Sequence, residues 1–162
     1  MPHNFRPSLV ALAVAATIVL APAAARAEDD AKAVAVKTTA AGAALFDARD
    51  AKGLAATYTD DARIDIYSKE QNSNALKIET KVGRAEIQAY YEELFKNSAA
   101  IHATSTIETA RRIDDDLMIF TGVFEPDNES ANPLKLPFTQ VRSRQGDAWK
   151  IVSLQLFIAP QK

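Results

Sequence analysis

Residues 45–62 read LFDARDAKGLAATYTDDA and encode a helix end, a tight corner, a second helix and the start of a strand. Asp50 is a good N-cap for a short helix over Ala51–Tyr58, because its carboxylate can accept a hydrogen bond from a backbone N–H of the first turn. Asp60 and Asp61 predict a turn, since aspartate side chains hydrogen-bond nearby backbone groups. A strand should follow this turn.

The flanking sequence predicts an α+β order, with helices first and a sheet after them. Alanine-rich Asp29–Ala48 favours a first helix, in which Gly42 would permit a close backbone approach. Gly83 precedes a third helix over Arg84–Asn97, whose apolar residues fall three and four apart on one face. Alternating patterns predict strands at Arg63–Tyr67, Leu76–Glu79, Ile101–Arg112, Leu117–Glu125, Pro137–Arg144 and Ala148–Ile158, with loops at Ser68–Asn74 and Pro126–Pro133.

The first 27 residues are typical of a secretory signal peptide. Arg6 precedes a 13-residue apolar run from Leu9 to Ala21, interrupted by Thr17, and residues 25–27 read Ala-Arg-Ala, a small-x-small cleavage pattern. The run is shorter than the roughly 20 residues that span a bilayer, although an uncleaved anchor is the alternative. We expect cleavage after Ala27, one domain over residues 28–162, a periplasmic or secreted location in a bacterium, and no membrane association afterwards.

Composition excludes several function classes. The net charge is −2 at pH 7 and both signs are mixed, which argues against a nucleic-acid partner. The chain has no cysteine, so disulfides, thiol chemistry and cysteine metal sites are excluded. His102 is the one histidine that would remain after cleavage, and we expect neither a metal nor a cofactor.

The element order resembles the nuclear transport factor 2-like superfamily, in particular its SnoaL-like and ketosteroid-isomerase-like branches. The resemblance rests on the acidic turn, the glycine that starts the third helix, and the closing strand Trp149-Lys150-Ile151-Val152. It implies a cone-shaped roll, in which three N-terminal helices pack on a strongly curved antiparallel sheet around one pocket. The chemistry in such a pocket varies from member to member.

The resemblance also implies that ketosteroid isomerase chemistry is absent. That enzyme uses an aspartate base, a tyrosine and a protonated aspartic acid. The matching positions of this chain hold Ile66, Gly42 and Gln140, respectively. Two tyrosines that support the catalytic phenol in those enzymes do have counterparts, Tyr58 and Tyr91.

Asp65 and His102 are the candidates for other catalysis. If Ile64 and Ile66 face the interior, Asp65 faces away as a solvated carboxylate, unless a bulge shifts the strand by one residue. His102 has the residue type for acid–base work near neutral pH, and its alternative is a structural or exposed role.

The two closing strands pose a question of facing. Gln140 and Arg142 share a face with Phe138, so an internal face would let Gln140 donate and accept hydrogen bonds and Arg142 hold a carboxylate. Alternatively, Arg142 pairs with an acidic neighbour at the rim. Apolar residues occupy both alternation sides of Ala148–Ile158, which predicts that both faces are covered, one of them by a second subunit. We therefore expect a homodimer through the sheet.

Three functions follow as hypotheses. The first is an exported protein that binds a small apolar or amphipathic molecule in a mainly apolar pocket. Its expected lining is Tyr58, Ile66, Tyr90, Tyr91, Gln140 and Gln155. The second is a lyase, cyclase or isomerase of the same fold that uses His102 or Asp65, and the third is a structural or interaction dimer whose cone is filled by its own side chains.

Overall fold

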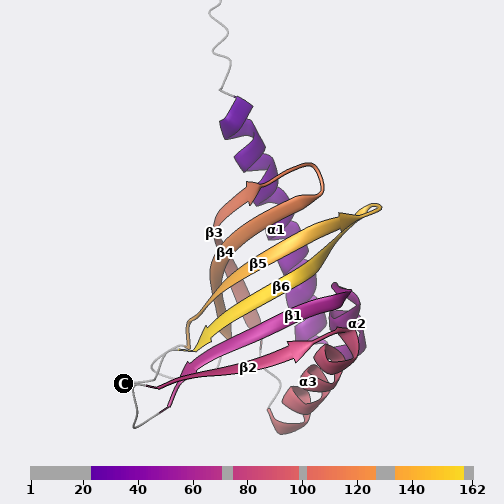
Figure 1. The fold of residues 1–162 in the computed structure, drawn as a ribbon, viewed down its shortest axis with the longest axis vertical. Helices are drawn as coiled ribbons and strands as arrows, with labels where there is room; N and C mark the ends of the chain where they lie inside the picture. The colour runs from indigo at the N-terminus through magenta and orange to yellow at the C-terminus, as the bar shows by residue number, and fades with distance from the viewer. Residues whose placement is uncertain (1–22, 71–74, 99–101, 127–133, 159–162) are drawn as a thin grey trace, which may run out of the picture.

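The structure, a computed structural model, describes residues 23–70, 75–98, 102–126 and 134–158 (Figure 1). Much of the expected signal segment and of the loops at 68–74 and 126–133 lies outside these ranges. The elements are α1 (Ala23–Asp47), α2 (Ala51–Ala56), β1 (Tyr58–Lys69), β2 (Leu76–Val82), α3 (Arg84–Asn97), β3 (Ala103–Arg112), β4 (Leu117–Pro126), β5 (Leu136–Gln145) and β6 (Ala148–Ile158). The expected cleavage after Ala27 falls near the start of α1.

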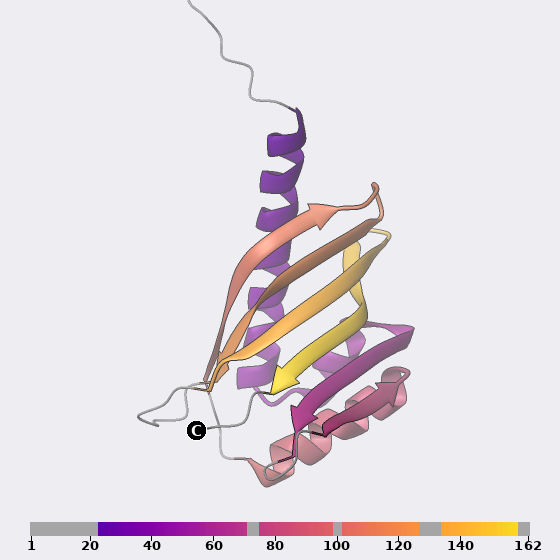
Figure 2. The same cartoon turned by 60° about the vertical axis from the view of Figure 1, so that its left-hand side comes forward.

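One twisted sheet holds all six strands in the order β2-β1-β6-β5-β4-β3. Neighbours are antiparallel except β1 and β6, which run parallel. Figures 1 and 2 show α1 crossing one face of the sheet beside β3, while α2 and α3 pack together next to β1 and β2. The predicted α+β roll with three N-terminal helices is confirmed, although the parallel pair departs from the purely antiparallel sheet that was expected.

The predicted role of Asp50 in the corner after α1 is confirmed. The Asp50 carboxylate accepts a hydrogen bond from the backbone N–H of Gly53 at 2.8 Å and caps α2. The expected turn at Asp60 and Asp61 is wrong, because both lie within β1, where the register against β6 shifts between Tyr58 and Arg63. A bulge in the strand thus stands where local propensity predicts a turn.

The third helix has the predicted bounds. Gly83 precedes it with a φ of 82°, a left-handed conformation that favours glycine. The Glu86 carboxylate accepts the N–H of Val82 at 2.8 Å, which closes the turn between β2 and α3. Ile87, Tyr91 and Phe95 are buried on the predicted apolar face.

A bulge also explains the apolar residues on both alternation sides of β6. The register between β5 and β6 shifts between Val141 and Arg142, where β6 has one extra residue. Odd-numbered residues before this bulge and even-numbered residues after it therefore lie on the same face of the sheet. Trp149 packs in the core beneath α1, and Ile151 and Leu154 line the concave side of the sheet. The two-sided pattern of β6 therefore arises in part from the bulge, while Phe157 remains an apolar residue on the outer face of the sheet.

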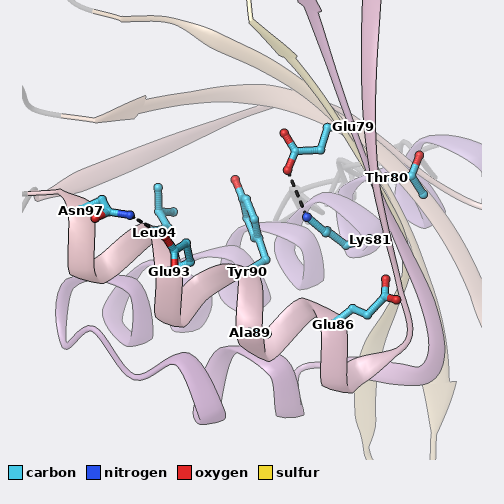
Figure 3. Close-up of a pocket in the computed structure, with 9 residues that line it drawn as sticks. All are labelled: Glu79, Thr80, Lys81, Glu86, Ala89, Tyr90, Glu93, Leu94 and Asn97. Carbon is cyan, nitrogen blue, oxygen red and sulfur yellow. Dashed lines mark hydrogen bonds and ion pairs between the residues drawn. The ribbon is translucent and has the colours of Figure 1, made fainter.

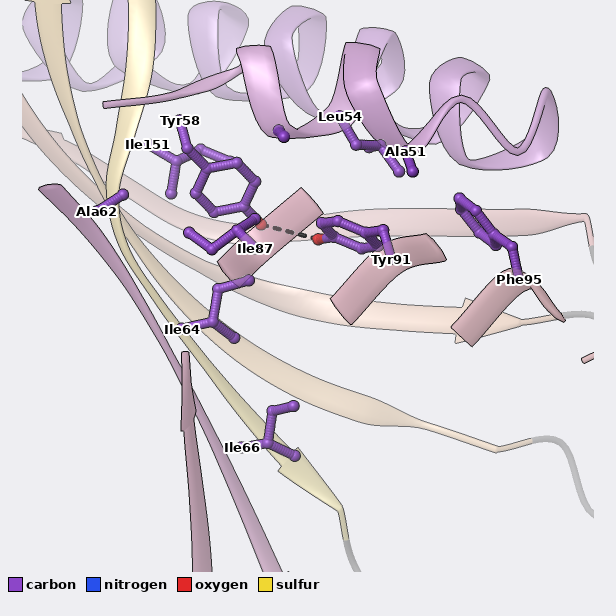
Figure 4. Close-up of a cluster of buried hydrophobic side chains, with 11 residues drawn as sticks. Ala51, Leu54, Tyr58, Ala62, Ile64, Ile66, Ile87, Tyr91, Phe95 and Ile151 are labelled. Atoms are coloured by element: carbon purple, nitrogen blue, oxygen red, sulfur yellow. Dashed lines mark hydrogen bonds between the residues drawn. The ribbon is translucent and has the colours of Figure 1, made fainter. Parts of the chain in front are cut away.

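Two clusters form the core. The first joins α2, α3 and β1 around Tyr58, Ile87 and Tyr91 (Figure 4), and the second lies beneath α1 around Met118 and Phe120. Gly122 is required in β4, because a Cβ there would clash with the backbone carbonyl oxygen of Thr106. In the part of the chain described, we find no helix whose length and apolar content would suffice for crossing a bilayer.

Candidate functional site

A cavity of about 320 Å³ lies between the concave face of the sheet and the three helices. Helix α1 lines it with Thr39, Gly42, Ala43 and Phe46, and α3 lines it with Tyr90, Tyr91 and Leu94. Strands β1, β4, β5 and β6 supply most of the remaining wall, which is mainly isoleucine, leucine and phenylalanine. The result is a mainly apolar chamber in which each polar side chain stands out.

Five of the six residues expected at the pocket line this cavity: Tyr58, Ile66, Tyr90, Tyr91 and Gln140. The sixth, Gln155, does not, and its placement there was wrong. Its register partners are Asp65 on β1 and Thr139 on β5, which lie on the outer face of the sheet. The bulge in β6 sets this facing, since Leu154, the preceding residue, points into the cavity.

Arg142 is the one charged residue among the described residues that line the cavity. It is only 4% exposed. Its Nε donates to Gln140 Oε1 at 3.0 Å and its Nη1 donates to the carbonyl oxygen of Trp149 at 3.2 Å. The guanidinium also lies 5.6 Å from the centre of the Phe120 ring. Burial lowers the pKa of Arg142 to about 10, although the Tyr58 phenol opposes this.

Of the two alternatives for Arg142, the one in which it pairs with an acidic neighbour at the rim is therefore wrong. Throughout the described ranges, no Asp or Glu forms an ion pair with it. Its face is internal because Arg142 shares a sheet level with buried Met118 on β4, beneath α1. Sequence patterning alone left this facing open.

Three tyrosines, Tyr58, Tyr90 and Tyr91, gather in the cavity wall, and Tyr58 is within electrostatic range of Arg142. The hydroxyls of Tyr58 and Tyr91 are 2.8 Å apart and share one hydrogen bond within the buried cluster (Figure 4). Burial raises the pKa of both phenols, and for Tyr58 the neighbouring Tyr91 adds to the rise. Burial, with smaller effects of Tyr91 and Glu79, raises the pKa of Tyr90 to about 12. All three phenols are consequently protonated at neutral pH.

Gly42 and Thr39 shape the wall that α1 contributes. A Cβ at Gly42 would meet nothing within 4 Å, so this glycine leaves open space beside α1. The close backbone approach expected at Gly42 is therefore wrong. The hydroxyl of Thr39 is buried and has no hydrogen-bond partner in the described structure. Sequence reasoning missed Thr39, because a threonine in an alanine-rich helix carries no distinguishing signal.

Asp65 lies outside the cavity, on the outer face that strand alternation predicted. It is 6% exposed, not solvated, because Arg63 and Thr80 cover it. Its carboxylate accepts hydrogen bonds from Arg63 Nε at 2.7 Å and from Thr80 Oγ1 at 2.6 Å. The hydrogen bond from Arg63 lowers the pKa of Asp65, so its carboxylate is ionised at neutral pH. Both of its oxygens accept hydrogen bonds from side chains of the sheet.

His102 also lies outside the cavity. Its side chain is 69% exposed, and its Nδ1 lies 2.6 Å from the carboxylate of Asp47 at the end of α1. The other oxygen of Asp47 accepts the N–H of Ala103 at 3.2 Å. The pair fastens the start of β3 to the end of α1.

A second, more open groove of about 680 Å³ runs between β2 and α3 (Figure 3). Glu79, Glu86 and Glu93 line it together with Lys81, whose Nζ lies 3.1 Å from the Glu79 carboxylate. Tyr90 borders both this groove and the cavity. Within the described ranges, no group of three His, Cys, Asp or Glu side chains is placed to hold a metal ion.

Neither a protein-family model nor a curated protein matches the chain. Solved structures do. A domain of unknown function with a cystatin-like fold from Nostoc punctiforme superposes with a TM-score of 0.62 at 14% identity, over 82% of this chain and 79% of that one. A nuclear transport factor 2-like protein of unknown function from Shewanella oneidensis gives 0.61 at 13% identity, over 76% and 95%. The chain has the nuclear transport factor 2-like fold.

The resemblance drawn from the sequence is thereby confirmed at the level of the fold. A ketosteroid isomerase-like protein from Erwinia carotovora also superposes on this chain, with a TM-score of 0.57 at 15% identity over 77% of this chain and 94% of that one. At such identities the likeness establishes fold and not activity. The positions that the resemblance matched to isomerase catalysis, Gly42, Ile66 and Gln140, all line the cavity of this chain.

Proposed function

We propose that this protein binds a small, largely apolar or amphipathic molecule in the cavity beneath its helices. One observation carries the proposal: the side chains of the cone leave about 320 Å³ unfilled. This volume lies at the lower end of the range of ligand sites and equals that of about ten water molecules. The apolar wall favours a hydrocarbon or aromatic body over a sugar or nucleotide.

The placement of the catalytic candidates supports binding over an isomerase, lyase or cyclase. Ile66 and Gly42 bring neither a base nor a phenol to the cavity. Asp65 and His102 lie outside it, each engaged in holding the fold. The unfilled volume likewise argues against the alternative of a cone closed by its own side chains.

Thermal denaturation with small aromatic compounds, such as indole and naphthalene derivatives, tests the proposal. A ligand at 100 times its Kd stabilises the folded state by about 2.7 kcal/mol, which for this chain length raises Tm by about 5–10 °C. Gly42→Leu is the matched control, because its side chain enters the open space and should abolish the shift without unfolding the protein. A Tm that no compound moves, or an equal shift in Gly42→Leu, would contradict the proposal.

We further propose that the mature protein is exported and forms a homodimer through the outer face of the sheet. Export is supported by the signal pattern of residues 1–27. Apolar side chains on the outer face support the dimer: Ile78 is 51% exposed and Phe157 is 40% exposed. The rings of Phe157 and Tyr67 stack with their centroids 5.1 Å apart. They form a flat aromatic surface that is suited to contact with a second copy of the chain.

A further inference from the structure

Polarity changes along the cavity from one end to the other. The sheet register sets the levels, because paired residues on neighbouring strands lie side by side. At one level, Ile151 on β6 pairs with both Tyr58 and Arg142. Further along, Leu156 pairs with both Ile66 and Phe138. One end of the chamber is thus polar and cationic, and the rest is mainly apolar.

The polar end has hydrogen-bond donors that the fold does not use. Arg142 has five N–H groups, and its two hydrogen bonds with protein acceptors engage Nε and one N–H of Nη1. Gln140 accepts from Arg142 through its oxygen, so its amide nitrogen provides two more donors on the same face. A buried cation and an amide therefore present N–H groups at a site lined by no described carboxylate.

The tyrosine pair adds a further donor. Two hydroxyl groups carry two protons, and the single bond between Tyr58 and Tyr91 uses one of them. Both phenols are protonated, since burial raises the pKa of each. The second proton is available to an acceptor in the cavity, and the guanidinium of Arg142 lies within electrostatic range of Tyr58.

We infer that the polar end binds a carboxylate, and that the ligand is a small acid with an apolar body. This inference rests on the proposed function and defines the chemical class of its ligand. Arg142 would hold the two carboxylate oxygens through its free N–H groups, with Gln140 and the tyrosine pair as further donors. One guanidinium balances one negative charge, so a dianionic phosphate would leave an unbalanced charge in this mainly apolar chamber.

Matched probes test the charge requirement. Naphthalene-2-carboxylate and naphthalene-2-carboxamide have the same shape, and isothermal titration of each into the purified protein at pH 7 compares them directly. We expect the carboxylate to bind at least tenfold more tightly. This comparison needs no variant and so does not depend on the folding of one.

Variants then locate the charge. Arg142→Met should remove the preference and leave the amide affinity within about threefold, while Arg142→Lys should retain part of it. Arg144→Met is the matched control, because Arg144 lies two residues along β5, is exposed and does not line the cavity. We expect it to bind like the unmodified protein.

The outcomes separate the two proposals. Equal binding of both probes, or a preference that survives in Arg142→Met, would overturn the carboxylate inference and leave small-molecule binding intact. Failure of both probes to bind the folded protein would contradict the proposed function and the inference together.

Discussion

The hydrogen bond between Tyr58 and Tyr91 allows a quantitative test of the site's construction. The two hydroxyl oxygens lie 2.8 Å apart, and both side chains are buried between α2, α3 and β1. Tyr58→Phe or Tyr91→Phe removes one hydroxyl and leaves the other without this partner. Each single change should lower the free energy of unfolding by about 1–3 kcal/mol, the range for a buried polar group that loses its partner.

The double substitution should be milder than the sum of the single ones. Removing both hydroxyls leaves no orphaned polar group, so two phenylalanines of the same shape can pack where the tyrosines did. We expect a coupling energy of about 1 kcal/mol or more between the two positions. That energy measures the hydrogen bond separately from the packing of the rings.

Urea unfolding, followed by the fluorescence of the single tryptophan Trp149, supplies the four free energies of the cycle. Tyr67→Phe is the control, because Tyr67 lies on the outer face and its hydroxyl makes no hydrogen bond within the described structure. It should change stability by less than about 0.5 kcal/mol. If the double variant loses as much as the two single variants combined, the hydroxyls do not interact and this account of the site is wrong.

Three more predictions follow from the same geometry. Gly42→Ala should stabilise the protein by about 0.5–1 kcal/mol in urea unfolding, because the methyl group enters open space beside a helix. Gly122→Ala should destabilise it, because the methyl group clashes with a carbonyl oxygen. The reverse order of stabilities would contradict the open space described at Gly42. The Tyr90 phenol has a pKa of about 12 when folded and 10 when unfolded, so its contribution is complete below pH 10 and about 2–3 kcal/mol is lost as the pH rises to 12. Tyr90→Phe should therefore flatten the decline measured between pH 9 and 11.5, and an unchanged slope would refute this. Phe157→Glu should convert the proposed dimer into a monomer in sedimentation experiments without lowering Tm, and a protein that is monomeric before the change would refute the dimer.

Much of the fold was predictable from local signals. The bounds of α3 and β6 match the expectation, because a clear apolar face delimits the helix and a Gly-containing turn marks where the strand begins. Asp50 likewise marks the start of α2, because its carboxylate accepts a hydrogen bond from Gly53, three residues further along the chain. Such features depend on neighbours in the sequence, and sequence patterns record them.

The bulges in β1 and β6 were not predictable, and they decide the site. Each depends on the pairing of strands that are distant in the chain, and a one-residue slip exchanges the faces of every residue beyond it. The shift in β6 places Leu154 inside and Gln155 outside, opposite to what was expected of Gln155. The shift in β1 absorbs Asp60 and Asp61 into the strand.

The facing of Arg142 illustrates a second limit of sequence reasoning. An arginine near the end of a strand is usually at the rim, because burying a guanidinium without a counter-ion is unfavourable. Only the assembled sheet shows that Phe120 and the carbonyl of Trp149 surround it. The cost of burying a charge, considered by itself, predicts a solvent-exposed position for Arg142 instead.

That departure is itself the strongest argument for a charged ligand. A pKa lowered from 12.5 to about 10 corresponds to about 3 kcal/mol against the buried charge, a large share of a stability of roughly 5–15 kcal/mol. Two hydrogen bonds, to Gln140 and Trp149, offset part of this and could be replaced by an apolar side chain of the same length. A carboxylate that enters the cavity would restore the counter-charge that no described residue supplies. Binding of such an acid should therefore stabilise the protein more than binding of its neutral amide does, by the difference that Arg142→Met removes.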